Sequence, residues 1–368
     1  MDLSRFVDVR IGTTPVSSGV AGGETVSAII AVLPVGGTER DWSQELYSLN
    51  DLIALGAGTH YPDTSAVYKA AQAYFNSGGS GLKVAQVLTA NLNPKIAALG
   101  NKYINVLVVG GDATYAMAVG AATAINTSAD VTIADKIIHY DITISEYNSL
   151  VAKGIGDNIR GLSVHVVGGA DAHHSVRAMV YLSKCKATGV DIIKEYLFTN
   201  LSPAIPVTFV AEYVDTRRFN VFTTINGEIV AVVGGTTTNG VQLVERYLAI
   251  VALQRITTQL ITYMTVDKPD FSASTPNELY NLITIELDRL QDSGWLVEGT
   301  APETIKKTKD LVEYELLTEG EILSDGYKVV ILPFNSSDMK TRTFRDIYVF
   351  LSTLVGITKF EIKGEVVR

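Results

Sequence analysis

The stretch SAVYKAAQAYFNSGGSGLKVAQVL, residues 65–88, decides the fold class, because a helix, a turn and a strand follow one another within it. Residues Ser65–Asn76 are predicted to form the helix, with Asp63 or Thr64 as its N-terminal cap. Helical spacing places a run of apolar side chains on one face of this helix. These side chains are Val67, Tyr68, Ala71, Tyr74 and Phe75.

The same stretch continues into a strand. Residues 76–79, Asn-Ser-Gly-Gly, end the helix, and the apolar segment Leu82–Leu88 follows. Another apolar segment, Ser27–Leu33, precedes the helix. The order strand, helix, strand predicts βαβ units in a parallel or mixed sheet.

This alternation continues along the chain. Further strands and helices are predicted at Ile104–Val109, Ala113–Ile125, Leu162–Val167, Val176–Lys186 and Val207–Tyr213. A hairpin follows, with strands Val221–Ile225 and Glu228–Val233 joined by Asn226-Gly227, since Asn-Gly between apolar runs is a strong hairpin signal. We therefore predict an α/β (α+β mixed) fold with βαβ-type sheets.

The pattern changes after Gly235. A long helix over Val241–Thr265 is predicted to direct inward Val244, Leu248, Val251, Leu260 and Met264. A second helix has Thr275 as N-cap, Pro276 at its first position and Glu278 closing a capping box, and it ends at Gly294. It is predicted to bury Leu279, Leu282, Ile283, Leu287 and Leu290. Strands are then predicted at Leu311–Thr318, Tyr327–Pro333, Arg345–Leu354 and Lys359–Val367.

The length of 368 residues predicts more than one domain, because single cores stop growing at about 250–300 residues. We place the boundary near residues 235–240, where the pattern changes. The predicted parts are an N-terminal strand arm and tether (1–22), an outer α/β domain (23–238), a C-terminal inner domain (239–356) and a C-terminal strand arm (357–368).

Composition excludes several classes of function. The net charge of −9 argues against nucleic acid as a direct partner, because phosphate binding needs a basic surface. The most apolar segment, Leu243–Val266, contains Glu245, Arg246 and Arg255, so it is not predicted to insert into a membrane. The N-terminal residues do not have the pattern of an export signal, and none is predicted. Cys185 is the single cysteine, which excludes an internal disulfide and a cysteine metal cluster.

Both ends of the chain have the period-two pattern of amphipathic strands. Val7, Val9 and Ile11 alternate with charged residues near the N-terminus, where the Gly- and Ser-rich residues 13–25 form a tether. Near the C-terminus the alternating positions are Phe360, Ile362, Gly364 and Val366. Such strands can pair within their own chain or join the sheet edge of a neighbouring copy, and the pattern alone leaves both open.

No enzymatic site is predicted, and neither a cofactor nor a metal is expected. Gly110-Gly111-Asp112 lies between a strand and a helix but lacks the spacing of a dinucleotide site, so a tight turn is favoured. Residues 77–83 are glycine-rich but lack the end of a P-loop. Asp171, His173 and His174 are the one cluster of metal-type ligands, and a helix cap with exposed imidazoles is the favoured interpretation.

One charged segment stands out on this acidic chain. Residues 303–310, ETIKKTKD, contain Lys306, Lys307 and Lys309. Mixed-charge segments are usually solvent-exposed faces, but the three lysines are also a candidate docking site for an acidic partner.

Four stretches resemble sheath proteins of contractile tails, the subunits that surround the tail tube of contractile phages and related injection systems. Residues 3–9, LSRFVDV, are similar to the start of one branch of these proteins, and residues 70–87 resemble their helix, Phe-Asn-Gly-Gly and strand. Residues 260–296 match their C-terminal domain. Residues 342–366, with Leu354-Val355-Gly356-Ile357 at a turn, resemble their closing strands. The middle, about 90–215, contains no such motif.

The resemblance implies a two-domain sheath subunit whose long terminal strands cross to neighbouring subunits and join their sheets. It implies a helical assembly of stacked hexamers around the tail tube, contracting to drive the tube through the host envelope without a nucleotide. The implied partners are other copies of the chain, the tube protein, and baseplate and tail terminator proteins. The implied location is the virion, after assembly in the bacterial cytoplasm.

On this reading the strand arms contain Phe6, Val7, Val9, Ile11, Phe360, Ile362, Gly364 and Val366, and the C-terminal arm is the first candidate for crossing. Charge alone suggests tube contacts at Lys306, Lys307, Lys309, Lys340 and Arg342.

Two alternatives remain. The chain could be another structural protein of the tail or baseplate, although its size and βαβ pattern disfavour the mostly β tube proteins. It could also be a soluble α/β enzyme that binds a small molecule, which would require a catalytic constellation that the sequence does not display.

Overall fold

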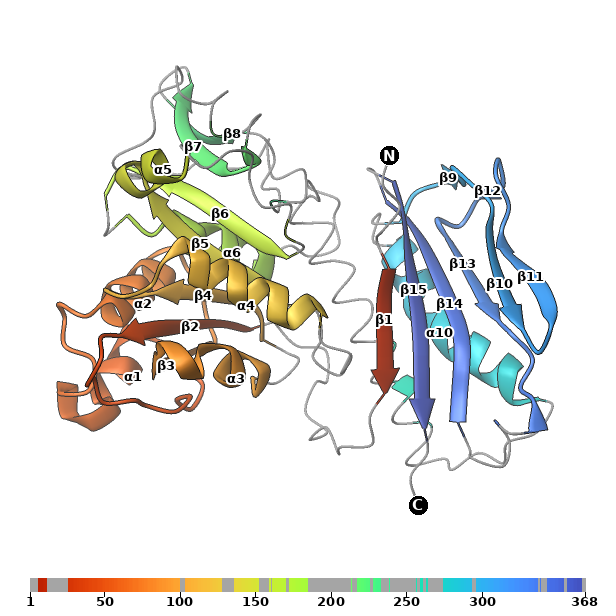
Figure 1. Ribbon diagram of the computed structural model, residues 1–368, viewed down its shortest axis with the longest axis horizontal. Helices are drawn as coiled ribbons and strands as arrows, with labels where there is room; N and C mark the ends of the chain where they lie inside the picture. The colour runs from red at the N-terminus through yellow and green to blue at the C-terminus, as the bar shows by residue number, and fades with distance from the viewer. Residues whose placement is uncertain are drawn as a thin grey trace.

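The computed structural model (Figure 1) describes most of the chain. The described residues are 6–11, 26–99, 103–127, 136–151, 159, 161–169, 172–184, 213, 217–225, 228–232, 238, 256, 259–260, 263, 274–292, 296–336, 338, 343–353 and 356–365. Among these residues, no helix has the length and apolar character needed to cross a membrane.

A seven-stranded sheet with the strand order β3-β2-β4-β5-β6-β7-β8 forms the first part of the fold. Its first six strands in this order pair in parallel, and β8 pairs antiparallel with β7. The strands are β2 (Val26–Leu33), β3 (Leu82–Leu88), β4 (Tyr103–Val109), β5 (Ile137–Thr143), β6 (Leu162–Val167), β7 (Asn220–Ile225) and β8 (Glu228–Val232). The predicted α/β (α+β mixed) class and the hairpin across positions 226–227 are confirmed.

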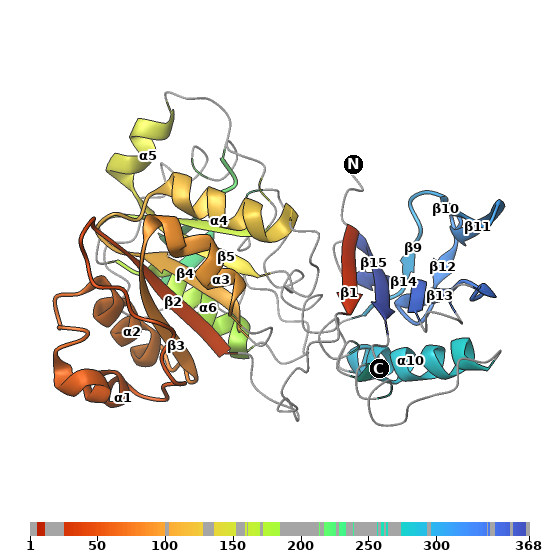
Figure 2. The same cartoon turned by 60° about the horizontal axis from the view of Figure 1, so that its bottom comes forward.

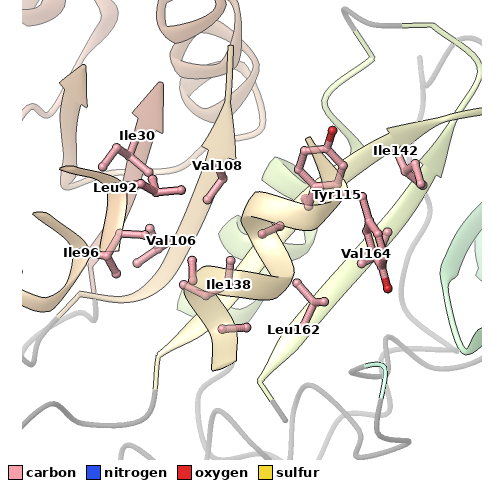
Figure 3. Close-up of a cluster of buried hydrophobic side chains, with 14 of the residues drawn as sticks. Ile30, Leu92, Ile96, Val106, Val108, Tyr115, Ile138, Ile142, Leu162 and Val164 are labelled. Atoms are coloured by element: carbon pink, nitrogen blue, oxygen red, sulfur yellow. The ribbon is translucent and has the colours of Figure 1, made fainter. Parts of the chain in front are cut away.

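Helices cover both faces of this sheet, because its strands alternate their apolar side chains between two cores. Ile29 and Ala31 of β2 belong to one core, whereas Ala28 and Ile30 belong to the other. The first core is completed by α1 (Leu49–Ala54), α2 (Ala66–Asn76) and α6 (His174–Lys184). The second contains α3 (Leu92–Ala97), α4 (Tyr115–Thr127) and α5 (Ile144–Val151), and Figure 3 shows part of it.

The helix and strand of residues 65–88 form as predicted, with one correction at the cap. The Ser65 hydroxyl accepts the Tyr68 N–H at 3.2 Å, so neither Asp63 nor Thr64 caps α2. The following turn packs tightly, since a Cβ atom at Gly79 would lie 2.4 Å from the Tyr74 ring.

Two elements between positions 126 and 161 were not predicted from the sequence. β5 and α5 occupy residues 137–143 and 144–151. The strand predicted at Val207–Tyr213 lies outside the described residues except for Tyr213, which is helical. The long helix over Val241–Thr265 is also mostly outside them, although Ile256 and Leu260 are helical and buried.

The second part of the fold is a four-stranded sheet with the order β1-β15-β14-β13. Figure 2 shows α10 (Thr275–Asp292) across one face of it. The strands are β1 (Phe6–Ile11), β13 (Tyr327–Ile331), β14 (Thr343–Thr353) and β15 (Gly356–Glu365). Two ribbons accompany the sheet, one of β9 (Gly299–Thr300) with β12 (Ile322–Leu323) and one of β10 (Ile305–Lys309) with β11 (Val312–Leu317).

The start of α10 differs from the predicted capping box. The helix begins at Thr275, so Ser274 takes the cap position, and its hydroxyl lies 3.1 Å from Glu278 Oε1. Of the five predicted core side chains, Leu279, Ile283, Leu287 and Leu290 are buried and Leu282 is half-buried.

The turn after β4 gives a test of packing at the centre of the larger sheet. Gly110 has φ +118°, and a Cβ atom there would lie 2.6 Å from the Val32 carbonyl oxygen. We expect Gly110→Ala to lower the free energy of unfolding by about 2–3 kcal/mol in urea denaturation. Gly111→Ala is the matched control, because its Cβ would meet no atom within 4 Å. Equal effects of the two substitutions would contradict this account.

Candidate assembly interface

The chain ends meet in the four-stranded sheet. In Figure 1 the red N-terminal strand β1 lies beside the blue C-terminal strand β15. The two strands run parallel, with a register from Phe6 opposite Lys359 to Ile11 opposite Gly364. Both ends are therefore strands, as predicted, although Val366 lies outside the described residues. In this single chain the two ends pair with each other.

β14 is the buried centre to which this pair attaches. Tyr348 and Phe350 pack into a core with Leu316, Leu317 and Leu323 on one side of the sheet. The alternate residues Ile347, Val349 and Leu351 are also buried, and they point to the opposite face, which α10 covers. β14 is therefore buried on both faces, and β15 pairs with this buried strand.

The two terminal strands differ in how they are connected. β15 returns directly onto β14, because Thr353 is opposite Gly356 and only positions 354 and 355 lie between them. β1 is separated from β2 by the fourteen residues Gly12–Thr25. A link of this length spans at most about 46–50 Å when fully extended. β15 cannot separate from β14 without opening this hairpin, whereas β1 is joined to β2 through a link of fourteen residues.

Two of the five residues suggested as tube contacts, Lys306 and Lys309, form ion pairs within the chain. Lys306 Nζ lies 2.9 Å from Glu313 and 3.7 Å from Glu315, and the hydrogen bond to Glu313 raises the pKa of Lys306. Lys309 Nζ lies 3.2 Å from Asp338 and 3.0 Å from Asp346, with its side chain 8% exposed.

Two charges that suggested a docking site are thus balanced by neighbouring carboxylates. Lys307 is half-buried on the same strand, and Lys340 and Arg342 lie outside the described residues. The tube contact remains a prediction. No local pattern pointed to Asp338 and Asp346, which the fold brings close to Lys309.

At two helix N-termini of the larger sheet, a carboxylate of the chain itself occupies the position where an anion could bind. Helix N-termini at the carboxyl ends of parallel strands attract phosphate. At α4, however, Glu146 Oε1 accepts the Tyr115 N–H at 3.0 Å. At α6, Asp141 Oδ1 accepts the Ser175 N–H at 2.8 Å. Residues 110–112 precede α4, where the Glu146 carboxylate takes the position that an anionic ligand would occupy. This agrees with the interpretation of residues 110–112 as a tight turn.

The cluster at Asp171, His173 and His174 differs from the prediction. His173 and His174 are 8% and 1% exposed, so they are not the exposed imidazoles of a helix cap. Asp171 lies outside the described residues, and within the described part no group of three or more His, Cys, Asp or Glu is placed to hold a metal ion. The period-two spacing of His139 and Asp141 in β5 is the signal that the sequence analysis missed.

Solved structures with a similar fold come from contractile injection systems. The sheath complex of PVC, an extracellular contractile injection system in its contracted state, matches with a TM-score of 0.54 and 13% identity, over 85% of this chain and 94% of that chain. The anti-feeding prophage (AFP) baseplate in its contracted state matches with a TM-score of 0.59 and 14% identity, over 92% and 94%. No protein-family model and no curated protein matches the sequence.

The chain therefore has the fold of contractile-sheath proteins, and the resemblance found in the sequence is confirmed at the level of the fold. Because the matches cover nearly the whole of both chains, this likeness includes both sheets rather than one common α/β unit.

The ion pairs of β10 give a testable difference between two lysines. We expect Lys309→Met to lower the free energy of unfolding by about 3 kcal/mol, because Asp338 and Asp346 would then face each other without a buried cation. Lys306→Met is the matched control on the same strand, and a much smaller effect is expected because its partners are exposed. Urea denaturation at pH 7 measures both, and similar losses would refute the structural role of Lys309.

Proposed function

We propose that this chain is a structural subunit of a contractile sheath and not an enzyme. The observation that carries this proposal is the likeness of fold over nearly the full length to proteins of contractile injection systems. In the proposed assembly, copies stack as hexamers in a helix around a tail tube. Contraction of that helix drives the tube through the envelope of the host cell.

The terminal strands are the proposed connectors. A strand added to a sheet is held by main-chain hydrogen bonds, which keep two subunits joined while each body rotates. β1 has the register and the link for this role, since Gly12–Thr25 connects it to the rest of the chain. A contact of this kind is head-to-tail, so it generates a helical filament wherever the rotation between copies does not close a ring.

The structure changes which strand we favour for crossing. The sequence favoured the C-terminal arm because of its regular alternation. β15, however, lies between β1 and β14 and is joined to β14 through two positions. We now favour β1 as the first strand to cross, with exchange of β15 requiring the β14–β15 hairpin to open.

The remaining partners follow from the proposed assembly. A sheath contacts the tube on its inside and the baseplate and tail terminator at its ends. The particle would be a phage tail or a related injection system, assembled in the bacterial cytoplasm. Likeness to a chain of the AFP baseplate structure supports one alternative, a structural subunit at the baseplate end of the same kind of particle.

Cysteine cross-linking distinguishes exchange from home pairing. Asp8 and Glu361 are register partners in the β1–β15 pair, so cysteines at both positions lie within disulfide range. In a Cys185→Ser background, we expect Asp8→Cys/Glu361→Cys to give a ladder of linked subunits on a non-reducing gel of assembled protein. Thr308→Cys/Glu313→Cys is the control, because these partners belong to one hairpin and must link within one chain. Linkage of Asp8→Cys/Glu361→Cys only within single chains would reject strand exchange.

A second test removes the connector. We expect deletion of residues 1–11 to abolish tubes in electron micrographs, while circular dichroism and the melting temperature remain close to those of the full chain, because β1 is an edge strand. Val9→Pro removes one backbone donor from β1 and should weaken assembly, whereas Val16→Pro in the link is its control. Normal tubes from the deletion variant would contradict the proposed role of β1.

A further inference from the structure

A polar cluster lies in the interior of the larger sheet, between α6 and the strands it covers. Parallel sheets covered on both faces are normally lined by apolar side chains. Here the face beneath α6 has Asn105 on β4, His139 and Asp141 on β5, and His165 on β6, all largely buried. Ser175 on α6 completes this cluster, which we call the α6 cluster. The proposed function uses none of these residues.

Hydrogen bonds connect the helix to the sheet through the α6 cluster. The Ser175 hydroxyl lies 2.8 Å from Asp141 Oδ1 and 3.0 Å from His165 Nδ1, and the Ser175 N–H donates to the same carboxylate oxygen. His139 Nε2 lies 3.1 Å from Asn105 Oδ1. The attachment of α6 therefore depends on polar contacts whose geometry changes when an imidazole or a carboxyl gains or loses a proton.

Three histidines of this region pack against other rings. The His139 and His165 rings stack at 6.4 Å, and His165 and His174 pack on Phe222 at 5.7 and 5.3 Å. Two further groups face the cluster, namely His173, which lies just before α6 and whose Nδ1 is 3.9 Å from Asp141 Oδ2, and the half-buried Arg177 of α6.

The other elements packed on α6 present no charged side chain to the cluster within the described residues. β2 and β7 contribute Ser27, Asn220 and Phe222, and α2 contributes apolar side chains and Tyr74. Among the described residues, Asp141 is therefore the one carboxyl group near the four imidazoles of His139, His165, His173 and His174.

Burial shifts the pKa of each of these groups in the direction that favours its neutral form. Desolvation lowers the pKa of His139 to about 3 and that of His174 to about 4, and it lowers the pKa of His165 well below its usual value. Desolvation also raises the pKa of Asp141 to about 7, although its hydrogen bonds to Ser175 act in the other direction.

We propose that the α6 cluster is a proton-operated latch, through which mild acid releases α6 from the larger sheet while the four-stranded sheet and α10 stay folded. The histidines stay neutral while α6 is docked, and they take up protons once it separates. Acid therefore favours the open state.

The expected pH dependence follows from counting protons. Below about pH 6.5, each histidine that is neutral when docked and protonated when released raises the opening constant up to tenfold per pH unit. Asp141 opposes this effect by up to tenfold per pH unit between about pH 4 and 7, because its proton is bound in the docked state and lost on release. His139, His165 and His174, opposed by Asp141, together give a net rise of up to about 100-fold per pH unit between pH 6.5 and 4.

Hydrogen exchange of the full chain tests the latch. The protein is incubated between pH 7.5 and 4.0, labelled in a short pulse at one fixed pH, and analysed by mass spectrometry. We expect peptides from α6, residues 174–184, to lose protection at higher pH than peptides from α10, residues 275–292. Simultaneous loss in both helices, or full protection of α6 at pH 4.0, would overturn the proposal.

Variants test whether the cluster is responsible. His139→Gln and His165→Gln each remove one titrating group, so each should reduce the pH dependence of opening by up to tenfold per pH unit. His60→Gln is the matched control, because His60 lies outside the α6 cluster. If either cluster variant fails to fold, ¹³C-histidine NMR of the unaltered chain serves instead. Cluster imidazoles that become protonated while α6 is still protected would refute the latch.

Discussion

The backbone of β15 is hydrogen-bonded on both sides, and this pairing brings the two ends of the chain together. β14 supplies one side through an antiparallel hairpin, and β1 supplies the other in parallel. Unpaired strand edges are costly when buried and prone to association when exposed. A sheet that is completed by a distant N-terminal strand can be completed equally well by the same strand from another copy. The arrangement that stabilises one chain is therefore also a template for joining several.

Much of this fold follows from local sequence patterns. Residues 65–88 predict their helix and strand because the change from period 3.6 to period 2 is sharp, and Asn226-Gly227 predicts the hairpin of β7 and β8. The prediction missed β5 although Ile138, Tyr140 and Ile142 form one apolar face at a period of two. His139 and Asp141 lie on the opposite face, and the polar cluster that explains their burial is tertiary. Ion pairs such as that of Lys309 with Asp346 were also beyond prediction, since they join residues far apart in the sequence.

The terminal strands show the limit of prediction at the interface itself. Alternation identified β1 and β15 as strands, because a period of two is a local property. It did not identify their partners, their parallel direction or their order in the sheet, which depend on β14 and on the lengths of the connections. Regular alternation favoured the C-terminal arm for exchange, whereas connectivity favours the N-terminal strand on its fourteen-residue link, Gly12–Thr25.

In the proposed assembly, exchange of β1 exchanges one set of main-chain hydrogen bonds for an identical set. Such an exchange contributes little net enthalpy. The equilibrium between pairing within one chain and pairing with a neighbour then depends on the link and on the concentration of neighbouring copies. Strand exchange can then hold subunits together in both extended and contracted lattices without favouring either. The free energy of contraction must come from other contacts between the bodies of the subunits. A connector that is neutral in this sense suits a sheath, because it stays engaged while the contacts around it change.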